Sequence, residues 1–143
     1  MIEIIKFENS NSSLFKSALD IRNNVFVKEQ KIDPKLEYDE NDVVATHFLL
    51  YENGNALATA RYRETSKGIK LERFAVLATY RNRGLGARLL EAVLNDVKPL
   101  NKLIYLHSQK SASNLYLRNG FRTIGHSFFE AGIEHLYMEY SGE

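Results

Sequence analysis

A short segment in the middle of the chain combines arginine and glycine residues in a spacing suited to binding an anion. It reads Arg81-Asn82-Arg83-Gly84-Leu85-Gly86, and the apolar residues that follow it repeat at helical spacing. Two glycines at a helix start let backbone N–H groups approach a ligand closely, and the positive end of the helix dipole favours negative charge. With Arg88 one turn further on, the segment is a candidate cradle for a pyrophosphate.

The glycine spacing alone leaves several interpretations open. The same residues could serve only a turn and a helix start. A Rossmann dinucleotide loop would need a third glycine where Leu89 stands and βαβ crossovers in place of the hairpins that precede it. A Walker loop would need Gly-Lys followed by Ser or Thr, which the sequence lacks.

Two motifs together give a more specific indication. Arg81 to Gly86 resembles the [Q/R]-x-x-G-x-[G/A] signature of the GNAT family of acyl-coenzyme A dependent N-acyltransferases, and Leu115 to Phe121 resembles the family's F-Y-x-x-x-G-F segment, departing only at Leu115. Arg22 to Gln30 resembles the R-x-x-V-F-V-x-E-Q segment of a subgroup of small bacterial single-domain members. Glu130 to His135 is similar to a late segment of that subgroup. The resemblance covers nearly the whole chain, and we treat residues 1–143 as one domain.

This resemblance implies an α+β fold, with a mixed, mainly antiparallel twisted sheet, a central splayed pair of parallel strands and flanking helices. The strand from Glu72 to Val76 would separate from the strand 103–107, and the pantetheine arm of acetyl-CoA would lie in the gap. The implied cofactor-binding residues are Ala75, Val76, Arg81, Asn82, Arg83, Gly84, Leu85, Gly86, Ala87 and Asn114. Asn114 could alternatively cap the helix that contains it.

The implied reaction is transfer of an acetyl or related short acyl group to a primary amine by direct attack in a ternary complex. The Val76 N–H would polarise the thioester carbonyl and stabilise the oxyanion. The Tyr116 hydroxyl would protonate the departing thiolate as a general acid. Because the chain has no Cys, a covalent intermediate on sulfur is excluded.

A protonated amine must lose a proton before it can attack, so a general base or a water chain is required. Glu72 is the first candidate, because it lies on the motif strand where many family members carry an acidic residue. Strand alternation predicts that Glu72 shares a face with Phe74 and Val76. His135 and His107 are rivals, since imidazole titrates near neutrality. A salt-bridging role for Glu72 and structural roles for both histidines remain the alternatives.

The resemblance places a further set of polar residues around the acceptor cleft: Glu29, Gln30, Asp39, Arg73, His107, Glu130 and His135. Acidic residues there would suit a cationic amine, although an acidic stretch such as 28–43 is most often a solvated surface. Arg73 could recognise a substrate carboxylate or pair with Glu29. The acceptor is left open between a small-molecule amine and an amine of a protein or peptide.

Elements that would position these residues can be read from the pattern of apolar residues. We expect strands at 2–7, 47–52, 56–63, 69–77, 103–107, 121–127 and 135–140, and helices at 14–27, from Leu85 to about Pro99, and at 112–118. Asn53-Gly54 predicts a tight hairpin. The expected order is β-α-β-β-β-α-β-α-β-β, with the acidic stretch as a loop-rich insertion.

Composition limits the remaining classes. The chain has 143 residues, with 19 Lys+Arg against 18 Asp+Glu and no Cys, so it fits one average domain without disulfides or Cys-ligated metal. The N-terminus carries Glu3 and Lys6 among few apolar residues, which does not match a signal peptide or membrane span. We expect a cytoplasmic protein without metal, nucleic-acid or membrane partners, and a homodimer is compatible with its apolar strands.

Two rival functions stay open at this point. The first is an acyl-CoA binding sensor or regulatory module that retains the cradle without turnover. The second is a nucleotide or nucleic-acid binding protein that uses the arginines, namely Arg61, Arg63, Arg73, Arg81, Arg83 and Arg88. A net charge of +1 argues against the second.

Overall fold

The computed structural model describes residues 1–8 and 12–142. Its strands are β1 (Ile2–Phe7), β2 (Thr46–Glu52), β3 (Asn55–Glu64), β4 (Ile69–Val76), β5 (Ile104–Gln109), β6 (Phe121–Thr123), β7 (Phe128–Glu130) and β8 (Ile133–Tyr140). Its α-helices are α1 (Ser13–Arg22), α2 (Pro34–Glu37), α3 (Leu85–Val97) and α4 (Ser113–Leu117). In this described part of the chain, no helix is both long and apolar enough to cross a membrane.

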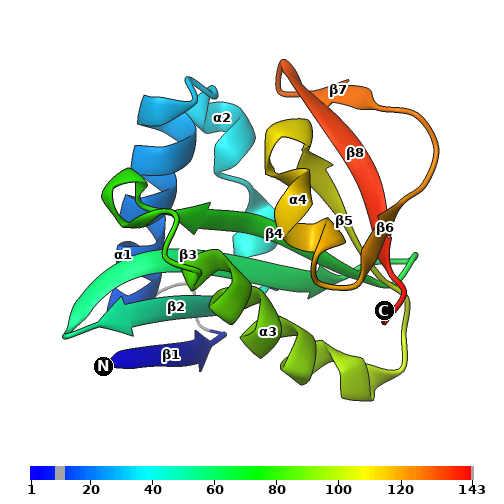
Figure 1. Ribbon diagram of the computed structural model, residues 1–143. Coiled ribbons are helices and arrows are strands. Elements are labelled where there is room, and N and C mark those ends of the chain that lie inside the picture. The colour runs from blue at the N-terminus through cyan, green and yellow to red at the C-terminus, as the bar shows by residue number, and fades with distance from the viewer. Residues whose placement is uncertain (9–11, 143) are drawn as a thin grey trace.

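The strands form one mixed sheet in the order β1-β2-β3-β4-β5-β8-β6, with β7 paired to β8 (Figure 1). All pairs are antiparallel except β4 with β5. The parallel pair begins at Ile69 opposite Ile104 and ends at Leu71 opposite Leu106, and beyond this point the two strands separate. The predicted mixed sheet with a splayed parallel pair and flanking helices is therefore confirmed.

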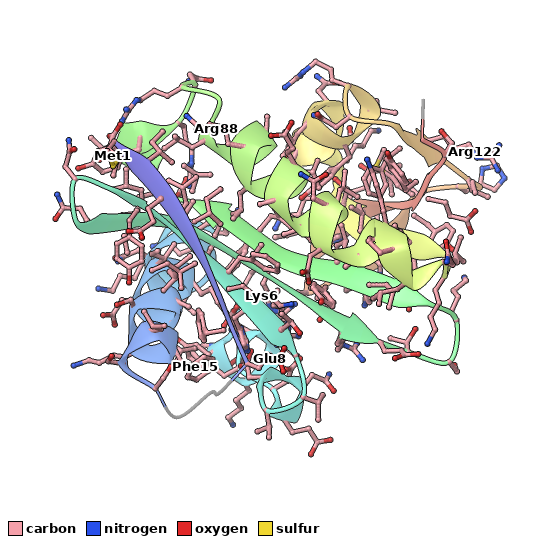
Figure 2. The ribbon with its side chains drawn as sticks, turned by 90° about the horizontal axis from the view of Figure 1, so that it is seen from below. Met1, Lys6, Glu8, Phe15, Arg88 and Arg122 are labelled. Carbon is pink, nitrogen blue, oxygen red and sulfur yellow. The ribbon has the colours of Figure 1, made fainter. Side chains whose placement is uncertain are left out.

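Helices cover both faces of the sheet, because neighbouring strand residues point to opposite faces. On β2, Leu50 packs in the apolar cluster that contains α3, whereas Leu49 packs in the cluster that contains α1. The edge view in Figure 2 shows α1 and α3 on opposite sides of the sheet, with β1 and Lys6 at its margin. The predicted stripe of α3 is buried as Leu85, Leu89, Leu90, Val93, Leu94 and Val97.

Two elements differ from the sequence prediction. The expected helix 14–27 is α1 followed by a π-helix, Asn23–Glu29, in which the N–H of Gln30 donates to the carbonyl of Val25. A π-helical turn accommodates one extra residue per hydrogen-bonded ring, so a search for helical period does not reveal it. The chain also forms β7, which turns into β8 through Ala131 and Gly132, both at positive φ.

A β-bulge in β4 changes which side chains share a face. Arg73 has a φ of 58°, and the register of β3 against β4 shifts between Thr59 and Arg61. As a result Leu71 and Phe74, three residues apart, both join the cluster under α3, and Glu72 lies on the opposite face with Ala75. The predicted placement of Glu72 with Phe74 and Val76 on one face is therefore wrong.

Candidate active site

A cleft of about 650 Å³ opens where β4 and β5 separate. It is bounded by the π-helix and α2 on one side and by β7 and the start of β8 on the other, with α4 between them (Figure 1). Of the residues singled out in the sequence, those that line it are Gln30, Asp39, Glu72, Arg73, Ala75, Val76, Arg81, Gly86, His107, Tyr116, Glu130 and His135. The structure thus brings together residues from nearly the whole length of the chain.

The remaining candidates lie outside the cleft lining. Most belong to the loop before α3 or to the first turn of that helix, namely Asn82, Arg83, Gly84, Leu85 and Ala87. The others are Glu29 and Asn114. The cap of α4 is Ala112, and Asn114 lies exposed within the helix. The alternative that Asn114 caps this helix is therefore wrong.

The start of α3 presents a row of free backbone donors beside the cleft. Gly84 caps the helix at a φ of 76°, and no side chain caps it. Within the described residues, no backbone carbonyl accepts a hydrogen bond from the N–H groups of residues 82–87. A Cβ at Gly84 would meet nothing within 4 Å. Free donors at the positive end of a helix dipole, with open space in front, fit an anionic group such as a pyrophosphate.

The arginine side chains of this segment are paired with carboxylates. Arg81 donates to both oxygens of Glu29 at 2.5 and 2.7 Å and through Nε to the carbonyl of Val76 at 2.9 Å. Arg83 donates to Glu52 at 2.6 Å. The pairs lower the pKa of Glu29 and of Glu52 through these hydrogen bonds. Because Arg81 takes Glu29, the suggested pairing of Arg73 with Glu29 is wrong.

Backbone orientation at the end of β4 separates Val76 from Ala75. Leu77 donates its N–H to the carbonyl of Leu57 in β3. Ala75, two residues before Leu77, lies opposite Thr59. Hydrogen-bonded pairs alternate along an antiparallel ladder, so the N–H and carbonyl of Ala75 face β3, whereas those of Phe74 and Val76 face the gap toward β5. Sequence reasoning missed Phe74 because the bulge that sets this phase leaves no periodic signal.

Tyr116 sits in the wall of the cleft. Its ring makes edge contacts with Phe74 and Phe121, each at 5.8 Å between centroids. Burial raises the pKa of Tyr116 well above its ordinary value, so the hydroxyl stays protonated at neutral pH. No hydrogen-bonded side chain contributes to that shift, and Tyr116 lines the cleft, which makes the phenolic proton available to a ligand.

Glu72 is held by three cations. Its Oε2 accepts hydrogen bonds from Arg61 at 2.8 Å and Arg63 at 3.0 Å, and Lys70 lies 3.2 Å from Oε1. Although burial acts in the opposite direction, these charges lower the pKa of Glu72 to about 2. A carboxylate with this pKa is a poor proton acceptor near neutrality.

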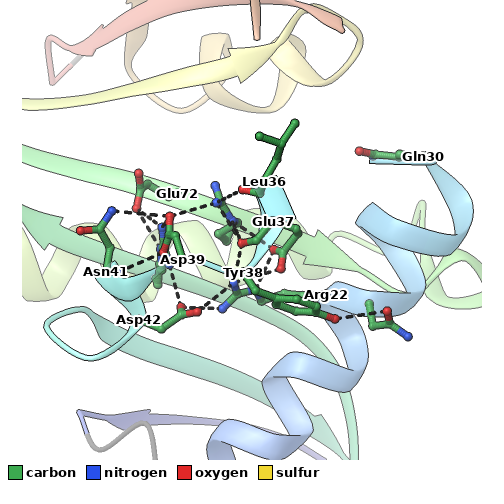
Figure 3. Close-up of polar contacts among 12 residues, drawn as sticks. Arg22, Gln30, Leu36, Glu37, Tyr38, Asp39, Asn41, Asp42 and Glu72 are labelled. Atoms are coloured by element: carbon green, nitrogen blue, oxygen red, sulfur yellow. Dashed lines mark hydrogen bonds and ion pairs between the residues drawn. The ribbon is translucent and has the colours of Figure 1, made fainter. Parts of the chain in front are cut away.

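The acidic stretch that precedes β2 is part of a buried ionic network (Figure 3). Arg22, which is 1% exposed, donates to Glu37 at 2.9 Å and to Asp42 at 2.7 Å. Arg61 joins Asp42 to Asp39 and Glu72. Because Glu37 and Asp42 are buried, the expectation of a solvated acidic surface is wrong for these residues.

Arg73 completes the network from the bulge. Its guanidinium lies 3.1 Å from a Glu37 oxygen and 3.3 Å from Asp39. Burial, together with Arg61, lowers the pKa of Arg73. The arginines proposed for a nucleic-acid surface are thus largely committed, since Arg61, Arg73, Arg81 and Arg83 all pair with carboxylates.

Two histidines line the cleft on the side of β5 and β8. His107 Nδ1 lies 3.1 Å from a carboxylate oxygen of Glu130, and His135 Nδ1 lies 2.7 Å from the carbonyl of Ile133. Nearby, Gln109 donates to Gln30 at 2.7 Å and so connects β5 to the end of the π-helix. Sequence reasoning missed Gln109, which belongs to no motif and would have required knowledge of the β5 to β8 register.

Comparison with known proteins agrees with this architecture. The chain superimposes on an acyl-CoA N-acyltransferase from Pseudomonas aeruginosa with a TM-score of 0.87 and 26% identity, covering 99% of this chain and 100% of that one. PaiA N-acetyltransferase from Thermoplasma acidophilum, solved in complex with coenzyme A, shares the fold at a TM-score of 0.72 and 12% identity over 99% of each chain. The fold is that of the acyl-CoA N-acyltransferase structures.

The family follows from the sequence comparisons. Residues 18–141 match the family model described as an acetyltransferase (GNAT) domain. "Uncharacterized N-acetyltransferase YjcF" of Bacillus subtilis is 31% identical over 130 residues, which cover 90% of this chain and 93% of the relative. The chain belongs to the GNAT acetyltransferase family.

Proposed function

We propose that this protein transfers an acetyl group from acetyl-CoA to a primary amine by direct attack in a ternary complex. One observation carries the proposal: a single cleft is lined by Gly86 from the row of free N–H groups at the start of α3, by Val76 at the open edge of β4 and by Tyr116. These features match the three parts of a thioester donor, namely its pyrophosphate, its carbonyl and its sulfur.

Donor binding would rest mainly on backbone groups. The N–H groups of residues 82–87 would hold the pyrophosphate, since nothing in the described protein occupies them. The pantetheine amides would pair with the backbone of Phe74 along the open edge of β4. Because Arg81 already holds the Val76 carbonyl, the Val76 N–H is the group directed to the thioester oxygen and its oxyanion.

Tyr116 would supply the proton that the departing thiolate needs. Burial of the residue keeps its hydroxyl protonated, and no hydrogen-bonded or charged side chain contributes to the raised pKa. Loss of the thiolate is then coupled to proton transfer. The acceptor would enter from the opposite face, where Gln30, Gln109, His107 and Glu130 gather, and a small-molecule amine or an exposed protein or peptide amine would both present the required nitrogen.

Calorimetric titration with acetyl-CoA, ATP, NAD and a short DNA duplex tests the donor site. We expect micromolar binding of acetyl-CoA alone. A screen of primary amines with detection of free thiol then tests transfer. Binding of acetyl-CoA without turnover for any amine would favour the sensor function, and failure of well-folded protein to bind acetyl-CoA would contradict the proposal.

A further inference from the structure

His107 and Glu130 form a pair on the acceptor face of the sheet. His107 on β5 lies opposite Tyr137 of β8, and Gln109 lies opposite His135, so all four side chains share one face. Leu106, the preceding residue, packs under α3 on the other face. Glu130 reaches the His107 ring from β7 across β8, with its carboxylate 3.1 Å from Nδ1. The pair therefore stands on the side from which an acceptor would approach.

The hydrogen bond to Glu130 sets the state of the imidazole. A carboxylate accepts from Nδ1–H, which leaves the lone pair of Nε2 free to take a proton. His107 lies in the cleft lining and its side chain is 26% exposed, so a proton that it takes up can return to solvent. His107 holds the pKa of the Glu130 carboxyl below its ordinary value, so Glu130 keeps the negative charge that stabilises an imidazolium.

The other candidates lack one of these properties. His135 has the same free Nε2, but its Nδ1 partner is the neutral carbonyl of Ile133 and only 7% of the residue is exposed. Glu72 is neutralised by Arg61, Arg63 and Lys70. The polar and aromatic groups around the His107 ring are Glu130 and Phe128 from β7, Tyr137 from β8 and Tyr105 from β5. His135 of β8 and Lys70 of β4 act on Glu130.

We propose that His107 is the general base for the acceptor amine and that Glu130 is its positioning residue. This inference rests on the proposed N-acetyltransferase function. The acceptor ammonium gives one proton to Nε2 of His107, and the freed nitrogen lone pair forms a C–N bond to the thioester carbon. The C–S bond then breaks, the second proton of that nitrogen reaches the sulfur through Tyr116, and His107 releases its proton to solvent.

Two amines of similar size and different basicity test the base directly. Ethylamine is protonated at neutral pH, whereas 2,2,2-trifluoroethylamine is largely neutral and needs no base before attack. We expect His107→Gln to slow transfer to ethylamine by roughly 100-fold and to leave transfer to trifluoroethylamine within a few-fold of wild type. Glu130→Gln should show the same preference. His126→Gln is the matched control, because His126 is exposed in the loop before β7.

Equal losses for both amines in His107→Gln, or no loss for ethylamine, would overturn the proposal while leaving the transferase intact. Wild-type protein that binds acetyl-CoA but acetylates neither amine would contradict the transfer function and the base together. Nitrogen-15 spectra of the histidine rings give a readout independent of any acceptor. We expect a proton on Nδ1 of His107 and a bare Nε2, with this preference lost in Glu130→Gln. A proton on Nε2 in the wild type would refute the assignment.

Discussion

Arg61 donates a hydrogen bond of 2.8 Å to Oε2 of Glu72, and both side chains are at least nine-tenths buried between β3 and β4. This pair joins the β4 side of the cleft to the ionic network of Arg22, Glu37 and Asp42. It also argues against Glu72, the acidic residue on the motif strand, as the general base. The charge of Glu72 is already used to hold Arg61 in the sheet.

Glu72→Gln should therefore reduce stability more than it changes catalytic pH dependence. Removing one partner of a buried ion pair leaves uncompensated charge and lowers the free energy of unfolding. We expect a fall of roughly 3 kcal/mol, at the lower end for such pairs, because Arg61 keeps its ion pairs with Asp39 and Asp42. Urea unfolding measures this change. The pH profile of acetyl transfer should keep its wild-type shape, and a profile that loses its rise on the acid side in this variant would support Glu72 as the base.

Acid should weaken the fold in two stages. Burial lowers the pKa of His47 from its ordinary 6.5, so the unfolded chain takes up this proton first and stability begins to fall below about pH 6.5. The pKa values of Asp39 and Glu72 are lowered to about 2 from 3.8 and 4.5. Their contribution is present above pH 4.5 and is lost as pH falls toward 2.

Denaturant unfolding followed by circular dichroism from pH 7.5 to pH 3 checks this order. His47→Gln should flatten the decline between pH 6.5 and 5, and Glu72→Gln should flatten the decline below pH 4.5. The stacked contact of His47 with Phe7, at 5.2 Å between centroids, will make the first variant less stable throughout. Stability that stays constant down to pH 3 would mean that these groups titrate alike in the folded and unfolded chain.

The sequence predicted those parts of the molecule that depend on short-range patterns. The period of α3, the Asn53-Gly54 hairpin and the positions of the strands other than β7 follow from local residue types, and the two motifs predicted the fold. The bulge at Arg73 and the π-helical turn at residues 23–29 were not predicted from the sequence, because each adds one residue to a regular element without a distinctive residue type. That single-residue shift decided the face of Glu72.

Pairing between distant charges was equally hidden. Glu37 and Asp42 belong to a stretch whose composition is that of a surface loop, yet Arg22 and Arg61 are buried and draw both carboxylates inward. Candidate residues could be listed from motifs, but their partners could not. Those partners separate a carboxylate that contacts a histidine in the cleft, as Glu130 does, from one held by three cations, as Glu72 is.

Gly84→Ala should weaken acetyl-CoA binding, whereas its loss of folding stability should match that of a control variant with the same backbone strain. Gly84 has a φ of 76°, so Ala costs about 1 kcal/mol of strain, and its Cβ would project where nothing in the described protein lies within 4 Å. Gly125→Ala is the matched control, because Gly125 has a φ of 79° and equally open surroundings away from the cleft. Calorimetry should show a dissociation constant for acetyl-CoA that is at least 10-fold higher in Gly84→Ala and unchanged in Gly125→Ala. Equal affinities in both variants would remove the cradle from the donor site.

Tyr116→Phe should separate donor binding from turnover. The phenyl ring can keep the edge contacts with Phe74 and Phe121, so the melting temperature and acetyl-CoA affinity should stay near wild type. Without the hydroxyl, the thiolate must leave unprotonated, and kcat should fall by roughly 100-fold. Burial keeps the Tyr116 pKa above its ordinary value. Deprotonation of Tyr116 should therefore not reduce wild-type activity below pH 10. A free-thiol assay that gives an unchanged kcat for the variant would show that another group protonates the sulfur.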